Sequence, residues 1–497
     1  MAALFLQLLS ILPFLVVLSS AAPLDATSSP VIQVFDALQR SDAGLSPQTL
    51  ITLRGSNGSA PATIQRWTLH DAPTFALYTR PATAADVRII VRTATQYQAP
   101  LLAIGGSHGF SSTLGKLDDG IALDLSALKQ VKVDTSANTV IVGGSVTFGE
   151  LLAPVAAAGR EIQTGLLPCV GAVGATLGGG IGRYAGLHGL VLDALQSVRL
   201  VTATGDLVTV SRTSNPELFW GLRGAGFNFG IVVEAVYAVY PVTAPQVMNA
   251  DFLIPLSQSA AVVRFFKLYE SKMPAELSIV AAVANSPQFG GAAILLNIVY
   301  VGALEVGSTY IQSLLDTTKP TLHNVTSIPW DQVSTKSFFA SATSSCVRGA
   351  NRNVYGAGVR NIDVPTFDDF FAKIGSFYQQ YPGAAGTVFF IERFATQAVQ
   401  VVSDDTTAYP HRDINTHLLF NYAYEDPSLE SDVNKFAKEL RQSFDSASGF
   451  DTPKVYVNYG HGDESQETLF GQRKLTRLRA LKKRFDSRGV FSFYHPL

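Results

Sequence analysis

The sequence predicts an α+β fold with two parts, the second of which contains an antiparallel sheet faced by helices. Three observations support this prediction. Short strand-like and helical segments alternate as far as about Val242, long apolar strand-like segments follow from Gln246, and two glycine-rich strings interrupt the first part. The chain has 497 residues, 47% of them hydrophobic and 15% charged, so it can bury a large core.

The first part begins with a polar stretch, which a helix follows at Thr83. Thr83 and Asp86 have the spacing of a capping box, and apolar residues recur at helical spacing from Val87 to Ala94. Glycine or turn residues bound the other expected elements. The expected strands are Leu101–Ile104, Ile121–Leu125, Thr139–Val142, a hairpin of Val198–Thr202 with Leu207–Val210, and Ile231–Tyr240; the expected helices are Phe148–Ala158 and Pro216–Leu222.

The second part has longer apolar strands joined by helical runs, which is typical of an antiparallel sheet covered on one face. Its expected strands are Val247–Leu256, Leu277–Ala284, Ala293–Val301, Thr387–Ile391, His417–Tyr424 and Lys454–Tyr459, and its expected helices are Ser259–Glu270, Asp368–Tyr381 and Leu429–Phe444. Near the C-terminus, Arg473–Arg484 has leucines at helical spacing, so we expect an amphipathic helix with a solvated cationic face.

The glycine-rich strings lie at the ends of expected strands. The first reads Gly105-Gly106-Ser107-His108-Gly109-Phe110, and the second runs from Gly171 to Gly182. Glycines keep side chains away, so backbone N–H groups can close around a pyrophosphate. A histidine within such a loop would be held against a bound dinucleotide.

Part of the second string, Gly180-Ile181-Gly182-Arg183-Tyr184-Ala185, matches the fingerprint of nicotinamide-dinucleotide-binding folds. That fingerprint requires a strand directly before it and a helix directly after it. Here glycines flank it on both sides, which favours neither element. The nicotinamide interpretation is therefore set aside.

Together with Gly224–Val232, the two strings resemble, in order and spacing, the vanillyl-alcohol-oxidase-type flavoproteins and, within them, the berberine bridge enzyme-like oxidoreductases. The resemblance covers about Leu77–Val242 and Val455–Leu497. It implies a two-part FAD-binding domain of the PCMH type. The implied division is an FAD-binding domain over 73–245, a substrate-binding domain over 246–453, and a C-terminal segment over 454–497 that returns to the FAD-binding domain.

The resemblance also implies that FAD is joined covalently to His108. A neutral imidazole nitrogen can attack the 8-methyl carbon of an oxidised flavin, and the resulting bond prevents loss of the cofactor. We expect further cofactor contacts from the same loops and from nearby positions. They are Gly105, Gly106, Ser107, Gly109, Phe110, Val170, Gly171, Gly174, Ala175, Thr176, Gly178, Gly179, Gly180, Gly182, His188, Ile231, Val232 and Asn458.

Many members of this family bind the flavin a second time, through a cysteine in a Cys-x-x-Val-Gly string. This chain has Leu167 at that position and Cys169 two residues later, a shift of several Å. We therefore expect one covalent link, with Cys169 not joined to the flavin. The only other cysteine is Cys346, and we expect two free thiols, although the sequence also allows one bridge between them.

Hydride transfer to a flavin requires a base that takes the proton from the substrate heteroatom. The resemblance implies a tyrosine in this role in some sugar oxidases, and Tyr459 is the matching candidate. Tyr422 and Tyr424 share one face of another expected strand and are further candidates. A phenol with a pKa of about 10 needs a cation or the flavin nearby to serve as a base. No set of histidines and carboxylates has the spacing of a metal site.

The first residues, Met1–Ala22, have a short apolar run that ends in small residues, which predicts a cleaved secretory signal and an extracellular protein. No Lys or Arg precedes the run, so an interfacial anchor stays open as an alternative to cleavage. In a secreted protein, the sequons at Asn57 and Asn324 would be available for N-glycosylation. A net charge of −2 argues against nucleic acid as a partner, and we expect no stable membrane insertion.

These expectations describe a secreted FAD-dependent oxidase that takes hydride from an alcohol, amine or activated C–H of a small natural product. Molecular oxygen would be the acceptor and hydrogen peroxide the product. The segment Ala175–Asp193 resembles members from fungal secondary metabolism. Two alternatives stay open: a carbohydrate (oligosaccharide) oxidase acting at the anomeric hydroxyl, and a flavin-bearing cyclase or binding module without net redox chemistry.

Overall fold

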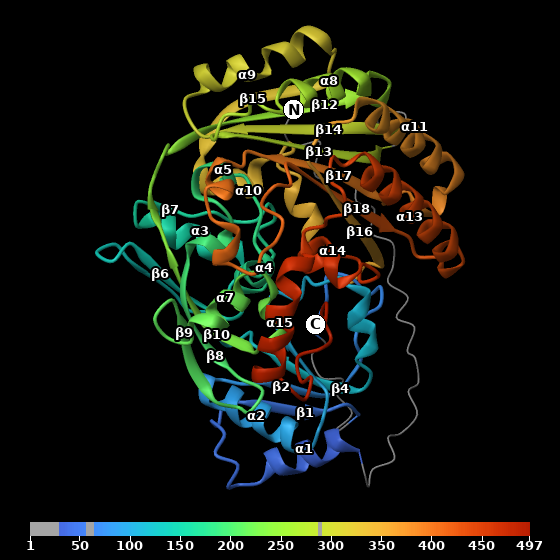
Figure 1. Cartoon of the computed structure of the whole chain (residues 1–497). Coiled ribbons are helices and arrows are strands. Elements are labelled where there is room, and N and C mark those ends of the chain that lie inside the picture. The colour runs from blue at the N-terminus through green and yellow to red at the C-terminus, as the bar shows by residue number, and fades with distance from the viewer. Residues whose placement is uncertain (1–28, 56–63, 287–290) are drawn as a thin grey trace.

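Three large β-sheets organise the described part of the chain, which comprises residues 29–55, 64–286 and 291–497 of a computed structural model (Figure 1). The expected secretory signal and the sequon at Asn57 lie outside the described residues. None of the helices in these three ranges combines the length and apolarity needed to cross a bilayer. Asn324 lies exposed on a strand at a sheet edge.

The first sheet has four strands in the order β1-β2-β4-β3, with β2, β4 and β3 parallel. These strands are β1 (Leu50–Leu53), β2 (Phe75–Arg80), β3 (Leu101–Ile104) and β4 (Gly120–Asp124). Helices α1 (Pro30–Gln39) and α2 (Ala84–Gln96) share its core. The capping box at Thr83 is confirmed. Helix α1 and strands β1 and β2 were not expected, because the polar residues around them obscure short apolar patterns such as Val31, Val34 and Leu38.

The second sheet has five antiparallel strands in the order β5-β6-β10-β8-β9. They are β5 (Val131–Asp134), β6 (Thr139–Gly143), β8 (Leu195–Val201), β9 (Leu207–Ser211) and β10 (Ile231–Ala238). The expected hairpin of β8 with β9 is confirmed. Helices α3 (Phe148–Ala157), α4 (Ala172–Gly178) and α7 (Pro216–Ala225) contribute to the same core.

The third sheet has seven antiparallel strands in the order β15-β12-β14-β13-β17-β18-β16. They are β12 (Gln246–Pro255), β13 (Leu277–Ser286), β14 (Gly291–Tyr300), β15 (Leu322–Pro329), β16 (Arg352–Val359), β17 (Val388–Phe394) and β18 (Thr416–Ala423). Helices α8 (Ser259–Leu268), α9 (Leu304–Thr317), α11 (Val364–Gln380) and α13 (Glu430–Ala447) lie on its outer side (Figure 1). The predicted antiparallel sheet faced by helices is thus confirmed.

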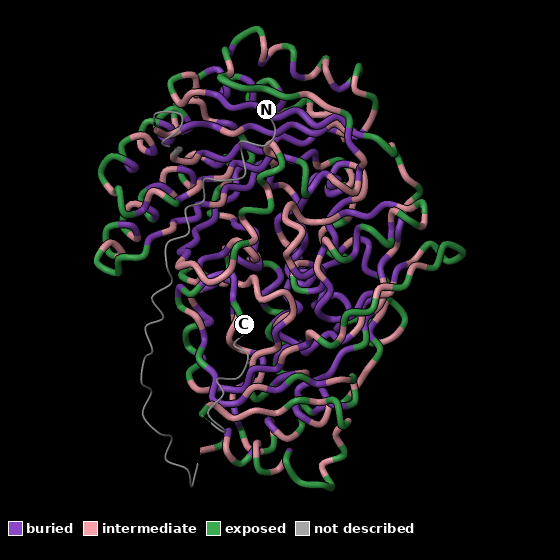
Figure 2. Tube along the Cα trace, turned by 180° about the vertical axis from the view of Figure 1, so that it is seen from behind, coloured by how far each residue is buried: buried purple, intermediate pink, exposed green. Residues whose placement is uncertain are grey.

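Alternation along each strand gives this third sheet two different faces. On the outer face, residues such as Ile279, Ile391 and Phe420 pack against the helices. On the inner face, their neighbours Val280, Glu392 and His417 form one row across three strands, and Val280 packs with Ile181 of the second glycine string. Figure 2 shows the inner strands of this sheet buried, while the helices expose residues on their outer sides.

The C-terminal segment differs from expectation at two points. Residues 454–459 do not form a strand, since Val457–Tyr459 is a single 3₁₀ turn (η12). Helix α15 (Gln472–Phe485) is amphipathic as expected, but its cationic side is not wholly solvated, because Lys474 and Lys482 are buried. Their ammonium groups donate to backbone carbonyls, which compensates the lost hydration.

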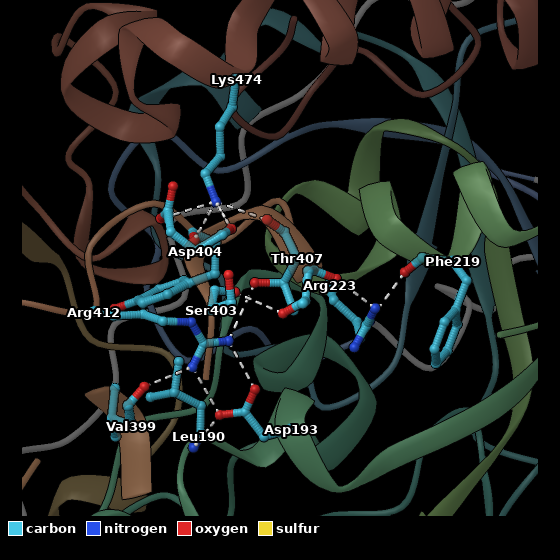
Figure 3. A network of polar contacts seen from close by, with 12 residues as sticks. Leu190, Asp193, Phe219, Arg223, Val399, Ser403, Asp404, Thr407, Arg412 and Lys474 are labelled. Atoms are coloured by element: carbon cyan, nitrogen blue, oxygen red, sulfur yellow. Dashed lines mark hydrogen bonds and ion pairs between the residues drawn. The ribbon is translucent and has the colours of Figure 1, made fainter. Parts of the chain in front are cut away.

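A polar network joins three distant segments of the chain (Figure 3). Lys474 donates to the carbonyls of Asp404, Thr407 and Tyr409 at 2.7–2.9 Å. Arg412 pairs with both carboxylate oxygens of Asp193 at 2.7 and 2.9 Å. Burial lowers the pKa of Lys474 to about 8. Because each buried cation has partners, this network can hold α15 and residues 404–412 against the part of the chain that contains the five-stranded sheet.

We expect the substitution Lys474→Met to lower the free energy of unfolding by about 2–4 kcal/mol, because it leaves several buried carbonyls without a donor. Urea unfolding followed by circular dichroism measures this. Lys483→Met, at an exposed position of the same helix, is the matched control and should have little effect. Equal stability of the two variants would show that the network does not hold these segments together.

Candidate functional site

A cavity of about 480 Å³ lies between the glycine loops and the inner face of the seven-stranded sheet. Its volume falls within the usual range for small-molecule and cofactor sites. One end is lined by the first glycine loop and by residues that precede β10 or lie on it. The other end is lined by inner-face residues of the sheet: Ala282, Ala284, Leu295, Val388, Phe390, Glu392, Leu419 and Asn421.

The two glycine loops meet backbone to backbone at Gly106 and Gly171. A Cβ added at Gly106 would collide with the Gly171 amide nitrogen, and one added at Gly171 would lie 2.9 Å from the Gly106 nitrogen. Only residues without side chains permit this approach. Beside the contact, Ser107 adopts a positive φ of 58°, and its buried hydroxyl has no partner among the described residues. The loops therefore enclose backbone groups and one unpaired hydroxyl at the cavity wall.

His108 is held at this wall as a neutral imidazole. Burial lowers its pKa to about 3, with smaller effects from the guanidinium groups of Arg348, Arg352 and Arg66. The Trp67 ring stacks on the imidazole at a centroid distance of 4.6 Å. A neutral ring keeps a nitrogen lone pair, so His108 has the protonation state that a nucleophile needs.

The predicted cofactor positions divide into two groups. The first group consists of predicted positions that line the cavity: Gly105, Gly106, Ser107, His108, Gly109, Phe110, Val170, Gly171, Gly174, Ala175, Gly180, Ile231, Val232 and Asn458. Thr176, Gly178, Gly179 and Gly182 instead serve packing: a Cβ at Gly178 would collide with Asn458, and one at Gly182 with the Thr164 carbonyl.

These features fit FAD. The cavity wall offers glycine backbone, an unpaired buried serine hydroxyl and a neutral histidine, which are groups that can hold a dinucleotide cofactor. Gly174 leaves open space where a Cβ would stand. The first glycine loop would hold the cofactor near His108, while Ile231 and Val232 would contact its apolar parts. When bound, FAD would supply a two-electron acceptor beside the sheet.

The expectation of two free thiols is wrong, because Cys169 and Cys346 form a disulfide. The residues are 177 positions apart in sequence, so their proximity depends on the tertiary fold and could not be inferred from their spacing. The Cys169 sulfur also lies 3.7 Å from Nε2 of His108. In this state Cys169 has no thiol to offer a cofactor, while Leu167 lines the cavity.

At the sheet end of the cavity, Tyr459 donates a hydrogen bond to Glu392 at 2.8 Å. Burial raises the pKa of Glu392 to about 7, and the tyrosine hydroxyl and Arg183 limit this rise. Burial and the adjacent carboxylate raise the pKa of Tyr459 well above its usual value. Tyr459 therefore remains a neutral donor, and Glu392 is the group that can take a proton near neutral pH.

Arg183 links Glu392 to a second buried carboxylate. Its guanidinium donates to Ser278 Oγ at 3.1 Å and to Asn297 Oδ1, and Asn297 donates to Asp251 at 2.6 Å. Burial lowers the pKa of Arg183 to about 10, an effect that Asp251 and Glu392 oppose. The arginine thus supplies the positive charge that two buried carboxylates need.

The 3₁₀ turn explains why both tyrosines of the C-terminal segment reach the cavity. Alternation on a strand would have put Tyr456 and Tyr459 on opposite faces, but residues three apart in a 3₁₀ turn lie on the same side. Their rings are 5.0 Å apart. The Tyr456 hydroxyl accepts from Gly180 N at 2.9 Å and from Asn458 at 2.7 Å, so this segment braces the second glycine loop.

Three predicted residues are not brought to the cavity. Tyr422 lies on the outer face of β18 against Phe377 and Phe389, so its neighbours Leu419 and Asn421 line the cavity instead. Tyr424 is buried at the end of the same face, where Asn353 donates to its hydroxyl. His188 pairs with Glu161 at 2.7 Å and stacks on Tyr240 at 4.0 Å.

The sequence interpretation missed Glu392, Arg183, Trp67 and Arg66. A signal for Glu392 was present, because it continues the period-2 pattern of Val388 and Phe390 and so places a carboxylate on a face of apolar residues. Trp67 and Arg66 lie in a short segment without periodicity. No pattern in the sequence indicates that they reach His108.

Comparison with known proteins gives two family matches. An FAD binding domain model matches residues 75–211, and a berberine and berberine-like model matches residues 455–497. The chain is 36% identical over 473 residues to the FAD-linked oxidoreductase azaL of Aspergillus niger, covering 94% of this chain and 98% of azaL.

Solved structures share the fold. BBE-like 1 of Physcomitrella patens superposes with a TM-score of 0.79 at 22% identity, covering 90% of this chain and 97% of that protein. Glucooligosaccharide oxidase of Acremonium strictum, which carries a 6-S-cysteinyl, 8α-N1-histidyl FAD, gives 0.74 at 22% identity, covering 87% and 93%.

We expect Gly171→Ala to lower the free energy of unfolding by about 1–3 kcal/mol, because its Cβ would push the two glycine loops apart. Gly386→Ala is the matched control, since its Cβ would be in ordinary contact with Ala423 at 3.4 Å outside the cavity lining, so it should have little effect. Urea unfolding of both variants and of the unsubstituted protein, at matched flavin content, measures the difference. Similar losses in both would contradict the proposed loop contact.

Proposed function

Because this chain belongs to the berberine bridge enzyme-like family of FAD-linked oxidoreductases, we propose that it is a secreted oxidase of a small, largely apolar natural product. The donor would give a hydride from a carbon that bears a hydroxyl or amine, or from an activated C–H. Molecular oxygen is the proposed final acceptor, and hydrogen peroxide the second product. One observation carries the proposal: the neutral His108 and the Glu392–Tyr459 pair line the same cavity.

The chain's own residues would perform the proton transfer. As the hydride leaves the donor carbon, the heteroatom proton would pass to the Glu392 carboxylate. Tyr459 would orient that carboxylate through its hydrogen bond, and Arg183 would stabilise its charged form. Because Glu392 is 2% exposed, bulk water would not compete for the donor proton.

The cavity lining supports an apolar donor. The sheet wall contributes alanine, leucine, valine and phenylalanine side chains around one carboxylate, Glu392, and one amide, Asn421. Such a surface stabilises apolar ligands by burial and offers few partners for the many hydroxyls of a sugar. An oligosaccharide donor is the second candidate, because Glucooligosaccharide oxidase shares this fold.

Two observations support export. Disulfides persist in oxidising compartments, and this chain has one. The sequon at Asn324 is exposed on edge strand β15, where a glycan could be attached. Together with the predicted signal over residues 1–22, they favour an extracellular protein.

The test of function is anaerobic mixing of the purified protein with separate panels of apolar alcohols, amines and oligosaccharides. Bleaching of the flavin by an apolar donor, followed by peroxide on admission of air, would support the proposal. Bleaching by oligosaccharides alone would favour the second candidate. A flavin that stays oxidised while a substrate is converted would favour a cyclase or template protein.

We expect a covalent link between His108 and FAD, with none on Cys169. Mass analysis of tryptic peptides should find an FAD-sized increment on the His108 peptide only. His108→Ala should release its flavin on acid precipitation, whereas the unsubstituted protein should stay yellow in the pellet. His188→Ala is the control histidine and should retain the flavin, because it lies outside the cavity lining. Retained colour in the His108 variant would contradict the link.

We expect kcat/KM to rise with pH and to level off above about pH 7, because Glu392 accepts a proton only when ionised. Glu392→Gln should lower kcat by about 10²–10⁴-fold and remove this rise. Glu305→Gln, at an exposed carboxylate on α9, is the control and should keep the profile. A profile unchanged in the Glu392 variant would assign the proton to another group.

A further inference from the structure

One connection of the seven-stranded sheet crosses the whole site. Strands β15 and β16 are consecutive in the chain but form opposite edges of the sheet. Six inter-strand spacings separate them, roughly 29 Å. The connection from Trp330 to Asn351 must therefore pass over one face of the sheet, and it takes the inner one, since its residues line the cavity. Figure 1 shows its helix α10 (Val333–Lys336) on that side.

The middle of this connection, residues 337–345, is named here the strap. It lines the cavity together with the apolar sheet wall. Its lining residues are Ser337, Phe338, Ser341, Ala342, Ser344 and Ser345. None of the sheet strands includes these residues, so the shape of this wall depends on how the strap is fastened at its ends.

At its start the strap is fastened to the sheet. The Phe338 amide donates to Asp251 at 2.7 Å, and the Ser337 hydroxyl donates to Asn249 at 3.2 Å. Phe338, Phe339 and Ala340 all have positive φ, between 56° and 62°. Residues with side chains rarely adopt this conformation, and it persists only where the surroundings impose it.

At its end the strap is fastened to the glycine loops. The Trp67 indole donates to the Ser345 carbonyl at 2.7 Å, and the next residue, Cys346, is joined to Cys169. Cys169 precedes Gly171, the residue that meets Gly106. Beyond the bond, Arg348 donates to the Gly106 carbonyl at 2.9 Å. A covalent bond thus sets the distance between the strap and the histidine that we propose holds FAD.

From this arrangement we propose that the strap is the substrate-selecting wall of the site, and that the Cys169–Cys346 disulfide holds it in the selecting position. The proposal rests on the proposed oxidase function for its substrate, an apolar hydride donor. Opening the bond removes the covalent fastening of the strap and leaves only the Trp67 and Arg348 hydrogen bonds at this end, while the glycine contact and His108 stay in place. Donor selection therefore weakens, while the cofactor stays bound and the proton acceptor is unchanged.

The test compares holoprotein with and without the bond. In the double variant Cys169→Ser/Cys346→Ser, KM for the preferred apolar donor should rise about tenfold or more while kcat stays within about twofold, and donors of different shape should be discriminated less. Val347→Ser, at an exposed position outside the strap, is the control. Flavin content, measured by absorbance, should be the same in all three proteins. An unchanged KM and an unchanged preference among donors would overturn the proposal.

Limited trypsin digestion gives a readout that does not depend on turnover. Lys336 is exposed at the start of the strap, and cleavage after it should be faster when the disulfide is absent. Equal cleavage rates would overturn the proposal even if no donor is found. Should the double variant fail to fold, reduction of the folded protein with a phosphine and alkylation with iodoacetamide opens the same bond. A protein in which the strap is released but no donor bleaches the flavin would refute the oxidase function alone.

Discussion

The backbone contact between Gly106 and Gly171 is the constraint on which the rest of the site depends. It brings together two loops that are far apart in sequence, and it leaves no room for a side chain at either position. His108 follows one of these glycines and Cys169 precedes the other. The contact therefore places the histidine, the disulfide and the end of the strap within one small region. A change that separates the loops would displace all three at once.

The opposite end of the site depends on desolvation. Glu392 is a carboxyl on a face of apolar residues, and burial alone would keep it protonated. Tyr459 and Arg183 restore part of the stabilisation that water would have given. The resulting pKa of about 7 lets the group exchange a proton under neutral conditions. The arginine is itself balanced by Asp251 through Asn297, so the charge at the proton acceptor depends on residues of three other strands.

The sequence predicted the features that local patterns encode. Glycines at strand ends revealed the loops and His108, and long apolar segments revealed most strands of the seven-stranded sheet. The same patterns could not say which face would meet the loops, so Tyr422 was chosen where its neighbour Asn421 lines the cavity. The strand expected at 454–459 is a 3₁₀ turn because Tyr456 and Asn458 bond to the second glycine loop, a tertiary contact. The disulfide and the pairing of Glu392 with Tyr459 likewise join segments whose proximity no local pattern records.

The two walls of the cavity carry different physical constraints. Each residue of the sheet wall belongs to a strand whose opposite face packs against α11 or α13, so a change of backbone there would disturb a core. The strap belongs to none of the sheet strands, and hydrogen bonds and the disulfide fasten its two ends. Side chains along it can therefore change with little effect on the fold. A protein built in this way can keep one hydride-accepting site and proton acceptor while the shape of the donor it admits changes at a single connection.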